Sequence, residues 1–188
     1  MLVSAMSSSV SSSLVVLLIC LSSLVCGAIP QVFQHTNLLR TIDLTKPYIR
    51  DSTALILENT SNSTQTDYYW GIPLNLVDRL SYLEVKEKKT GATHLFPVEK
   101  ALEDHSYCLC RSTVAKSRLL QVYKVQLPEL KAGEKISLVI STAYVDCLTP
   151  YPAIVAQDGK QYLLYNGEKY APTLYATLKQ KTKIKYSP

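Results

Sequence analysis

Alternation of apolar and polar side chains at every second residue is the feature that most constrains the fold of this chain. It is clearest in Glu134–Cys147, whose apolar side carries Ile136, Leu138, Ile140 and Tyr144. Successive side chains of a strand point to opposite faces of the sheet, so this pattern predicts a half-buried strand. Leu119–Leu127 alternates in the same way and predicts a second one.

Other short runs along the chain also favour extended structure, at 52–58, 68–74, 80–86, 107–113, 153–156, 161–165 and 173–186. The turn-like segment Pro128–Gly133 predicts a hairpin between the two strongest strands, and Asp158-Gly159 predicts another. The helix signal is limited to one short turn within Leu76–Leu83. Short alternating runs separated by turns predict an all-β fold, an antiparallel β-sandwich.

The first 28 residues predict a secretory signal peptide. Leu14–Val25 is an apolar run that small residues follow at Cys26, Gly27 and Ala28. This is the layout of an apolar core before a cleavage site, and the run is shorter than the roughly 20 residues of a membrane-spanning helix. A buried core helix is the alternative, which the Ser-rich start of the chain disfavours. We expect the mature chain to begin near Ile29.

Composition excludes several functions. The net charge of +5 is spread along the chain without a basic block, so nucleic acid is not an expected partner. The sequence has no Gly-rich phosphate loop, no HExxH and no GxSxG motif. Its acidic residues form no convincing pair for acid–base chemistry. We therefore expect no catalytic site, no cofactor and no metal centre in this chain.

Two glycosylation motifs overlap a polar stretch, Asn59–Asp67, that is expected to be an exposed loop. Asn59-Thr60-Ser61 and Asn62-Ser63-Thr64 both match the acceptor pattern Asn-x-Ser/Thr. In a secreted chain such a motif directs an N-linked glycan to the Asn side chain. We expect at least one of Asn59 and Asn62 to be modified.

Three cysteines follow the leader, at Cys108, Cys110 and Cys147. An odd number in an oxidising compartment predicts one disulfide and one spare thiol. The expected bond joins Cys147 to either Cys108 or Cys110, and the residues do not decide between them.

Four lysines occupy alternate positions near the end of the chain, at Lys179, Lys181, Lys183 and Lys185. On a strand they share one face, with Leu178, Thr182, Ile184 and Tyr186 on the other. They could contact an anionic partner. The favoured interpretation is an edge strand that its lysines protect against pairing with other sheets.

Three stretches resemble the amino-terminal lumenal region of the ribophorin I family. They are Arg40–Leu44 with Tyr48-Ile49, then Leu127-Pro128 through Gly133–Ile140, and Tyr144 through Pro150-Tyr151-Pro152 to Gln161–Tyr165. Their order and spacing match the family from about Arg40 onward. The segment Asn59–Ala115, with its cysteines and glycosylation motifs, is not typical of the family.

The resemblance implies a subunit that does not itself catalyse, in the oligosaccharyltransferase complex of the endoplasmic reticulum. That complex transfers an oligosaccharide from dolichyl diphosphate to Asn-x-Ser/Thr of nascent polypeptides, with catalysis in another subunit. The implied partners are the other subunits, nascent chains and the membrane, through a carboxy-terminal helix missing from this chain. The implied domains are a signal peptide (1–28), a first lumenal β-sandwich (29–149), and a linker with the start of an incomplete second β-rich domain (150–188).

The alternative function is a secreted carbohydrate-binding or adhesion-type β-sandwich module. An exposed aromatic platform would support it, and Tyr68, Tyr69 and Trp70 cluster directly after the glycosylation motifs. Neighbouring side chains on a strand face opposite ways, so at least one of Tyr68 and Tyr69 is expected in the core. The segment Thr149–Pro152 is expected to end the long strand in an extended corner that marks a crossing between sheets or domains, because proline restricts its own and the preceding backbone.

Overall fold

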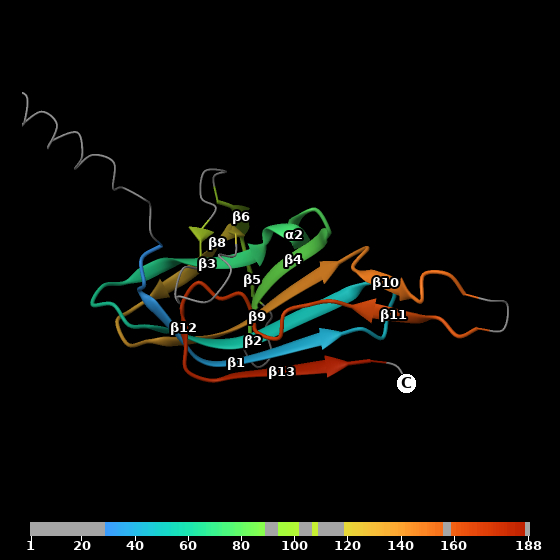
Figure 1. Cartoon of the computed structure of the whole chain (residues 1–188). Helices are drawn as coiled ribbons and strands as arrows, with labels where there is room; N and C mark the ends of the chain where they lie inside the picture. The colour runs from blue at the N-terminus through green and yellow to red at the C-terminus, as the bar shows by residue number, and fades with distance from the viewer. Residues whose placement is uncertain (1–28, 89–93, 102–106, 109–118, 156–158, 187–188) are drawn as a thin grey trace, which may run out of the picture.

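The computed structural model describes residues 29–88, 94–101, 107–108, 119–155 and 159–186 (Figure 1). These residues are mostly β-strand, arranged in several sheets, and their helical structure is a single four-residue element, α2 (Leu74–Val77). The expected all-β class is confirmed. The expected signal peptide, residues 1–28, lies outside the described residues.

The strands in chain order are β1 (Phe33–Asp43), β2 (Ile49–Asn59), β3 (Gln65–Pro73), β4 (Leu80–Glu87), β5 (Leu95–Phe96), β6 (Val98–Lys100), β7 (Tyr107–Cys108), β8 (Leu119–Leu130), β9 (Lys135–Tyr144), β10 (Leu148–Tyr151), β11 (Tyr162–Tyr165), β12 (Ala176–Thr177) and β13 (Gln180–Lys185). The largest sheet has the order β12-β1-β2-β9-β4-β5, and β13 also pairs with β1. A second sheet has the order β3-β8-β6, with β7 also paired to β8, and β10 and β11 form a two-stranded sheet.

The buried faces of the two larger sheets contribute to one apolar cluster. The large sheet contributes Leu38, Leu55, Leu57, Leu138 and Ile140, and the smaller one contributes Tyr68, Trp70, Ile72, Val122 and Val125. Burial alternates residue by residue along β2, as the period of a strand requires. Figure 1 shows β3, β6 and β8 lying over β1, β2 and β9.

The connection between β8 and β9 corrects the prediction of a hairpin at Pro128–Gly133. β8 pairs with β3, β6 and β7, whereas β9 pairs with β2 and β4, so the chain crosses from one sheet to the other here. Gly133 has φ of 76°, a backbone conformation that glycine adopts without a steric cost. Both strands carry an apolar face, which either arrangement buries, so alternation could not distinguish a hairpin from a crossing.

The largest sheet is mixed, which corrects the expectation of a purely antiparallel fold. β12 and β13 run parallel to β1, and the other pairs of described strands are antiparallel. The segment 166–175, called the crossover segment here, leads from β11 in the two-stranded sheet to β12 in the largest sheet. Within it Ala171, Leu174 and Tyr175 are buried in the same cluster as the two sheets.

The last described strand, β13, is therefore paired with the first one, β1. The backbone amides of Leu38 and Leu44 donate to the carbonyl oxygens of Lys179 and Lys185, at 2.9 and 2.8 Å. The domain boundary expected between residues 149 and 150 stays a prediction. Within the described residues, the stretch from Ala171 to Lys185 belongs to the core and the largest sheet.

The segment around Pro150 is extended and lies in a different sheet from the long strand β9. Thr149, Pro150 and Tyr151 are part of β10, which pairs with β11 through Leu148–Tyr165 and Tyr151–Tyr162. β10 pairs with no other described strand, so the missing amide proton of Pro150 has a place on its unpaired side. Residues 153–155 are not strand, and Asp158 of the predicted turn lies outside the described residues.

His35 is buried between the two larger sheets. Its Nε2 lies 3.1 Å from the Tyr68 hydroxyl and its Nδ1 lies 3.1 Å from Thr177 Oγ1. The rings of Tyr68 and Tyr175 contact the imidazole edge to face. Burial lowers the pKa of His35 from 6.5 to about 4, because the apolar surroundings disfavour the charged form.

We expect the free energy of unfolding to fall as the pH drops from 6.5 to 4. In that window the unfolded chain binds a proton at residue 35 that the folded chain does not bind, so acid favours unfolding. The difference between the two pKa values corresponds to a loss of about 3 kcal/mol. Urea unfolding of the wild type and of His35→Gln, measured across this range, checks it. Equal pH slopes for the two proteins would contradict the prediction.

Candidate functional site

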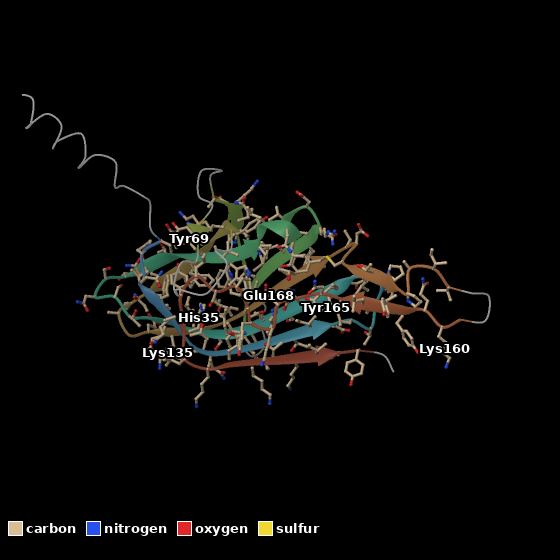
Figure 2. All side chains as sticks on the ribbon, viewed as in Figure 1. His35, Tyr69, Lys135, Lys160, Tyr165 and Glu168 are labelled. Carbon is tan, nitrogen blue, oxygen red and sulfur yellow. The ribbon has the colours of Figure 1, made fainter. Side chains whose placement is uncertain are left out.

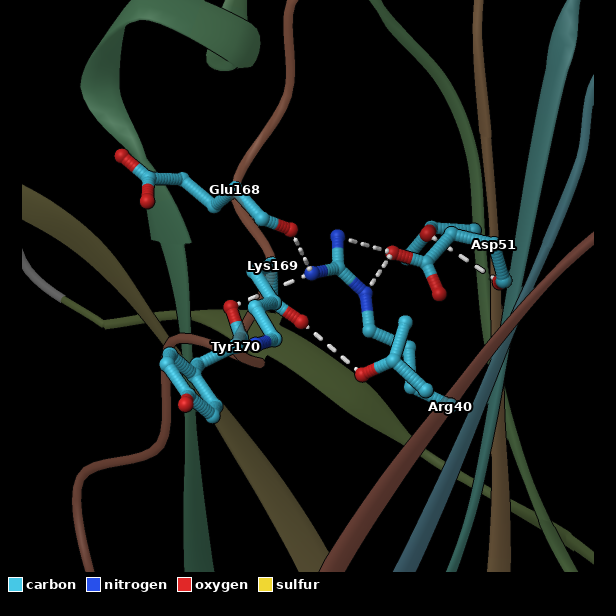
Figure 3. Close-up of polar contacts among 7 residues, drawn as sticks. Arg40, Asp51, Glu168, Lys169 and Tyr170 are labelled. Carbon is cyan, nitrogen blue, oxygen red and sulfur yellow. Dashed lines mark hydrogen bonds and ion pairs between the residues drawn. The ribbon is translucent and has the colours of Figure 1, made fainter.

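Arg40 and Asp51 form a buried ion pair between β1 and β2 (Figure 3). Arg40 Nε donates to Asp51 Oδ2 at 2.8 Å, and Arg40 Nη2 lies 2.7 Å from the same oxygen. The two side chains are only 6% and 11% exposed. Asp51 Oδ1 is buried and has no hydrogen-bond partner among the described residues.

The second function of Arg40 is to hold the crossover segment 166–175. Its Nη1 donates to the carbonyl oxygens of Glu168 and Tyr170, at 2.7 and 3.1 Å. Thr182 of β13 donates to the carbonyl oxygen of Lys169 between them, at 2.8 Å. Figure 3 shows the guanidinium between the Asp51 carboxylate and these carbonyl groups. One side chain therefore links β1, β2 and the crossover.

The charges of this pair depend on each other. Burial raises the pKa of the Asp51 carboxyl, and the Arg40 guanidinium opposes this rise. Burial disfavours the charged guanidinium too, but the Asp51 carboxylate more than offsets it and raises the pKa of Arg40 above its usual value. Burial also raises the pKa of the nearby Tyr144 phenol to about 12. At neutral pH the Tyr144 phenol is therefore neutral.

A groove of about 730 Å³ lies beside this ion pair, between α2 and the β10–β11 hairpin. Leu74 and Leu76 of α2 line one side, and Leu164 and Tyr165 of β11 line the other. Its polar groups come from Asn75, Arg79, Thr149, Asn166 and Glu168. Figure 2 shows Tyr165 and Glu168 close together where the hairpin joins the sheets. An open groove of mixed polarity is suited to binding a ligand or a partner.

The β10–β11 hairpin exposes an unusual amount of apolar surface. Tyr151, Tyr162 and Leu163 are 63–65% exposed, Leu164 is 54% exposed and Ile154 in the connecting segment is 90% exposed. Leu163 and Leu164 are neighbours in one strand and face opposite ways, so both faces of the hairpin present apolar groups to solvent. In Figure 1 the hairpin projects from one end of the larger sheets.

An isolated two-stranded sheet gains little stability from its own contacts, and exposed apolar patches mark interaction sites. The hairpin is therefore the candidate interaction surface of this chain. Alternation of residue types could not find it, because Tyr162-Leu-Leu-Tyr165 is continuously apolar. The lack of alternation could have indicated this surface, because a strand that is apolar on both faces needs packing partners on both faces.

The two predicted glycosylation residues differ in their surroundings. Asn62 is exposed in the loop between β2 and β3, as expected. Asn59 is not in an exposed loop but ends β2 and is fully buried, with 0% of its surface exposed. Its side-chain amide donates to the carbonyl oxygens of Ser63 and Leu130, both at 2.8 Å.

The predicted lysines lie at an edge of the largest sheet. Lys181, Lys183 and Lys185 are in β13 and Lys179 precedes it, and all four side chains are exposed. Among the described strands β13 pairs only with β1. This position fits the interpretation that the lysines protect a sheet edge. Both that interpretation and the anionic contact stay predictions.

The described residues include only some of the cysteines of the predicted disulfide. Cys147 is half-buried beside the groove, and its thiol donates to the carbonyl oxygen of Val145 at 3.3 Å without a disulfide to another described residue. Cys108 is placed by its backbone in β7, and Cys110 lies outside the described residues. The pairing stays a prediction.

The described residues contain neither a metal-binding cluster nor a membrane-spanning helix. Among these residues no three His, Cys, Asp or Glu side chains gather closely enough to hold a metal ion. No helix within the described ranges is long and apolar enough to cross a membrane.

The aromatic cluster after the glycosylation motifs is part of the core. Tyr68 is fully buried and Trp70 is 5% exposed, while Tyr69 between them is half-buried. Tyr68 stacks on Tyr175, with ring centres 5.4 Å apart. The expectation that at least one of Tyr68 and Tyr69 is a core residue is confirmed, and these rings form no exposed platform.

Comparison with known proteins bears on the predicted family. The sequence model of a family described as Ribophorin I matches residues 33–188. Subunit 1 of the dolichyl-diphosphooligosaccharide–protein glycosyltransferase of Schizosaccharomyces pombe is 30% identical over 158 residues, covering 82% of this chain and 30% of that protein. The Caenorhabditis elegans subunit 1 is 27% identical over 154 residues, covering 81% of this chain and 24% of that protein.

This chain thus spans less than a third of the length of either relative. The matched region includes the described strands from β1 to β13. The resemblance that the three sequence stretches predicted is confirmed: the chain belongs to the ribophorin I family.

Proposed function

We propose that this chain is the amino-terminal part of an accessory subunit of the oligosaccharyltransferase complex. In that complex it supports transfer of a dolichyl-diphosphate-linked oligosaccharide to Asn-x-Ser/Thr of nascent proteins, and another subunit carries the catalytic residues. Membership of the ribophorin I family and the names of its two relatives support this assignment. Fold by itself could not, because many functions share β-rich folds.

The location follows from the same proposal. Residues 1–28 act as a signal peptide, and a β-sandwich formed by residues from Ile29 onward lies in the lumen of the endoplasmic reticulum. A membrane helix beyond this chain anchors the complete subunit. The proposed division of the chain is a first lumenal domain (29–149), followed by a linker and the start of a second β-rich domain (150–188). The pairing of β13 with β1 joins residues 180–185 of the second part to the largest sheet.

The observation that carries a docking role is the apolar β10–β11 hairpin. We propose that it packs against an apolar surface of another subunit of the complex. Leu163 and Leu164 support this, because these side chains lie on opposite faces of β11 and each remains more than half exposed. A partner that covers them buries apolar area, which is the main favourable contribution to most protein associations. Nascent polypeptides held near the catalytic subunit are the further proposed partners.

We expect Leu163→Asp in the full-length subunit to weaken its co-purification with the other subunits by about tenfold or more. A charge in the centre of an apolar contact removes at least 1.4 kcal/mol of binding free energy, which is a factor of ten. The test replaces the endogenous subunit by a tagged variant and measures the partners recovered and the occupancy of a glycosylation reporter.

The matched control is Leu95→Asp. Leu95 is 56% exposed in β5 of the largest sheet, away from the hairpin, so it has similar exposure at a different place. Both substitutions leave the core intact, and thermal unfolding verifies this. Equal recovery of partners from the two variants would rule out docking by the hairpin, and failure of even the wild-type subunit to recover them would rule out the proposed function.

A further inference from the structure

Asn59 connects the two places where the chain crosses between sheets. Its backbone amide donates to the carbonyl oxygen of Glu134 at 3.0 Å, and its own carbonyl oxygen accepts from the Gly133 amide at 2.8 Å. Its side-chain Oδ1 accepts from the amide and the hydroxyl of Ser61, at 2.9 and 2.7 Å. The residue thus joins the turn after β2 to the turn before β9.

The nitrogen that would carry a glycan on Asn59 is already used. Asn59 Nδ2 has two protons, and it donates them to the carbonyl oxygens of Ser63 and Leu130. A glycan on this nitrogen replaces one proton, which leaves one carbonyl oxygen without a donor. The side chain is also 0% exposed, so the sugar has no space in the folded domain. Folding and glycosylation at Asn59 exclude each other.

Asn62 differs from Asn59 in its exposure. Its side chain lies in the exposed loop after β2. Thr64, which completes its acceptor motif, is exposed as well. In Figure 1 the loop between β2 and β3 lies at the end of the molecule opposite the β10–β11 hairpin. A glycan here therefore leaves both the core and the candidate interaction surface uncovered.

We propose that Asn62 carries an N-linked glycan and that Asn59 remains unmodified in the folded protein. In the reaction Asn62 Nδ2 forms a bond to the anomeric carbon of the oligosaccharide and loses one proton. The bond between that carbon and a phosphate oxygen of the lipid diphosphate donor breaks, and the lipid diphosphate leaves with its electron pair. The inference rests on the proposed function, which places the chain in the compartment that holds this donor.

The test expresses the full-length subunit with its leader in a eukaryotic cell and examines the soluble, folded lumenal part by glycosidase digestion and peptide mass spectrometry. Two variants separate the motifs. Thr64→Ala removes the acceptor motif of Asn62, and Ser61→Ala removes that of Asn59 while Asn59 itself stays in place. We expect a glycan on Asn62 in the wild type and in Ser61→Ala, and none at either position in Thr64→Ala.

Folded protein with a glycan on Asn59, or lumenal wild-type protein without one on Asn62, would overturn the inference. Protection of the domain from added protease in sealed microsomes shows whether it has entered the lumen. A domain that the protease digests would overturn the proposed function together with this inference. A protected domain without the glycan on Asn62 would overturn only the inference, so the two failures are distinguishable.

Discussion

Replacement of Arg40 by Met is expected to lower the free energy of unfolding by about 3–5 kcal/mol, because it leaves the Asp51 carboxylate buried without a compensating charge. The carbonyl oxygens of Glu168 and Tyr170 also lose their donor. Equilibrium urea unfolding measures the loss. We further expect faster amide hydrogen exchange in β13, since Arg40 and Thr182 together hold the crossover that leads into this strand.

The double substitution Arg40→Met with Asp51→Leu is the informative control for this prediction. It removes both charges and fills the space with apolar groups, so it should be clearly more stable than Arg40→Met. Exchange in β13 should remain fast in both, because neither restores the contacts to the crossover. A double variant as unstable as the single one would show that the unpaired carboxylate is not the cause of the loss.

Asn59→Asp is the second substitution with a large expected effect. The new side chain keeps the shape and the accepting oxygen of Asn59 but removes both donated protons, so the carbonyl oxygens of Ser63 and Leu130 lose their partner. A buried polar group left unpaired costs roughly 1–3 kcal/mol, so we expect a loss of at least about 2 kcal/mol. Urea unfolding of protein made in bacteria, which carries no glycan, provides the measurement.

Asn62→Asp provides the comparison at the neighbouring motif. Its side chain is exposed, so the same change of chemistry should alter the free energy of unfolding by less than about 0.5 kcal/mol. A small effect at both positions would contradict the structural role given to Asn59. A large effect at both would contradict the exposed placement of Asn62.

The fold class could be predicted from the sequence because alternation is a local property of each strand. Ile136, Leu138 and Ile140 are buried in β9 as their spacing predicts. The pairing of strands is not local. The chain between β8 and β9 crosses between sheets instead of forming a hairpin, and β13 returns to pair with β1 at a separation of more than 130 residues. Such contacts depend on packing of the complete core, which alternation does not encode.

The burial of polar residues in the core could not be predicted from the sequence. Arg40 lay within a stretch that resembled the family, and Asp51 bordered a predicted strand, but neither position indicated an ion pair between β1 and β2. Asn59 matched a glycosylation motif and was expected on the surface. Instead it is buried at the end of β2, where its amide satisfies backbone groups of two turns. Burial of a polar side chain depends on partners that only the folded chain brings together.

The measurement that tests the central claim most directly is photo-crosslinking from the hairpin within the assembled complex. A photoreactive amino acid replaces Leu163 in the full-length subunit, and a second protein carries it at Leu95. We predict that position 163 forms an adduct with another subunit of the oligosaccharyltransferase and that position 95 does not. Absence of an adduct from position 163 in membranes where the complex is intact would contradict the account of this chain as a docking subunit.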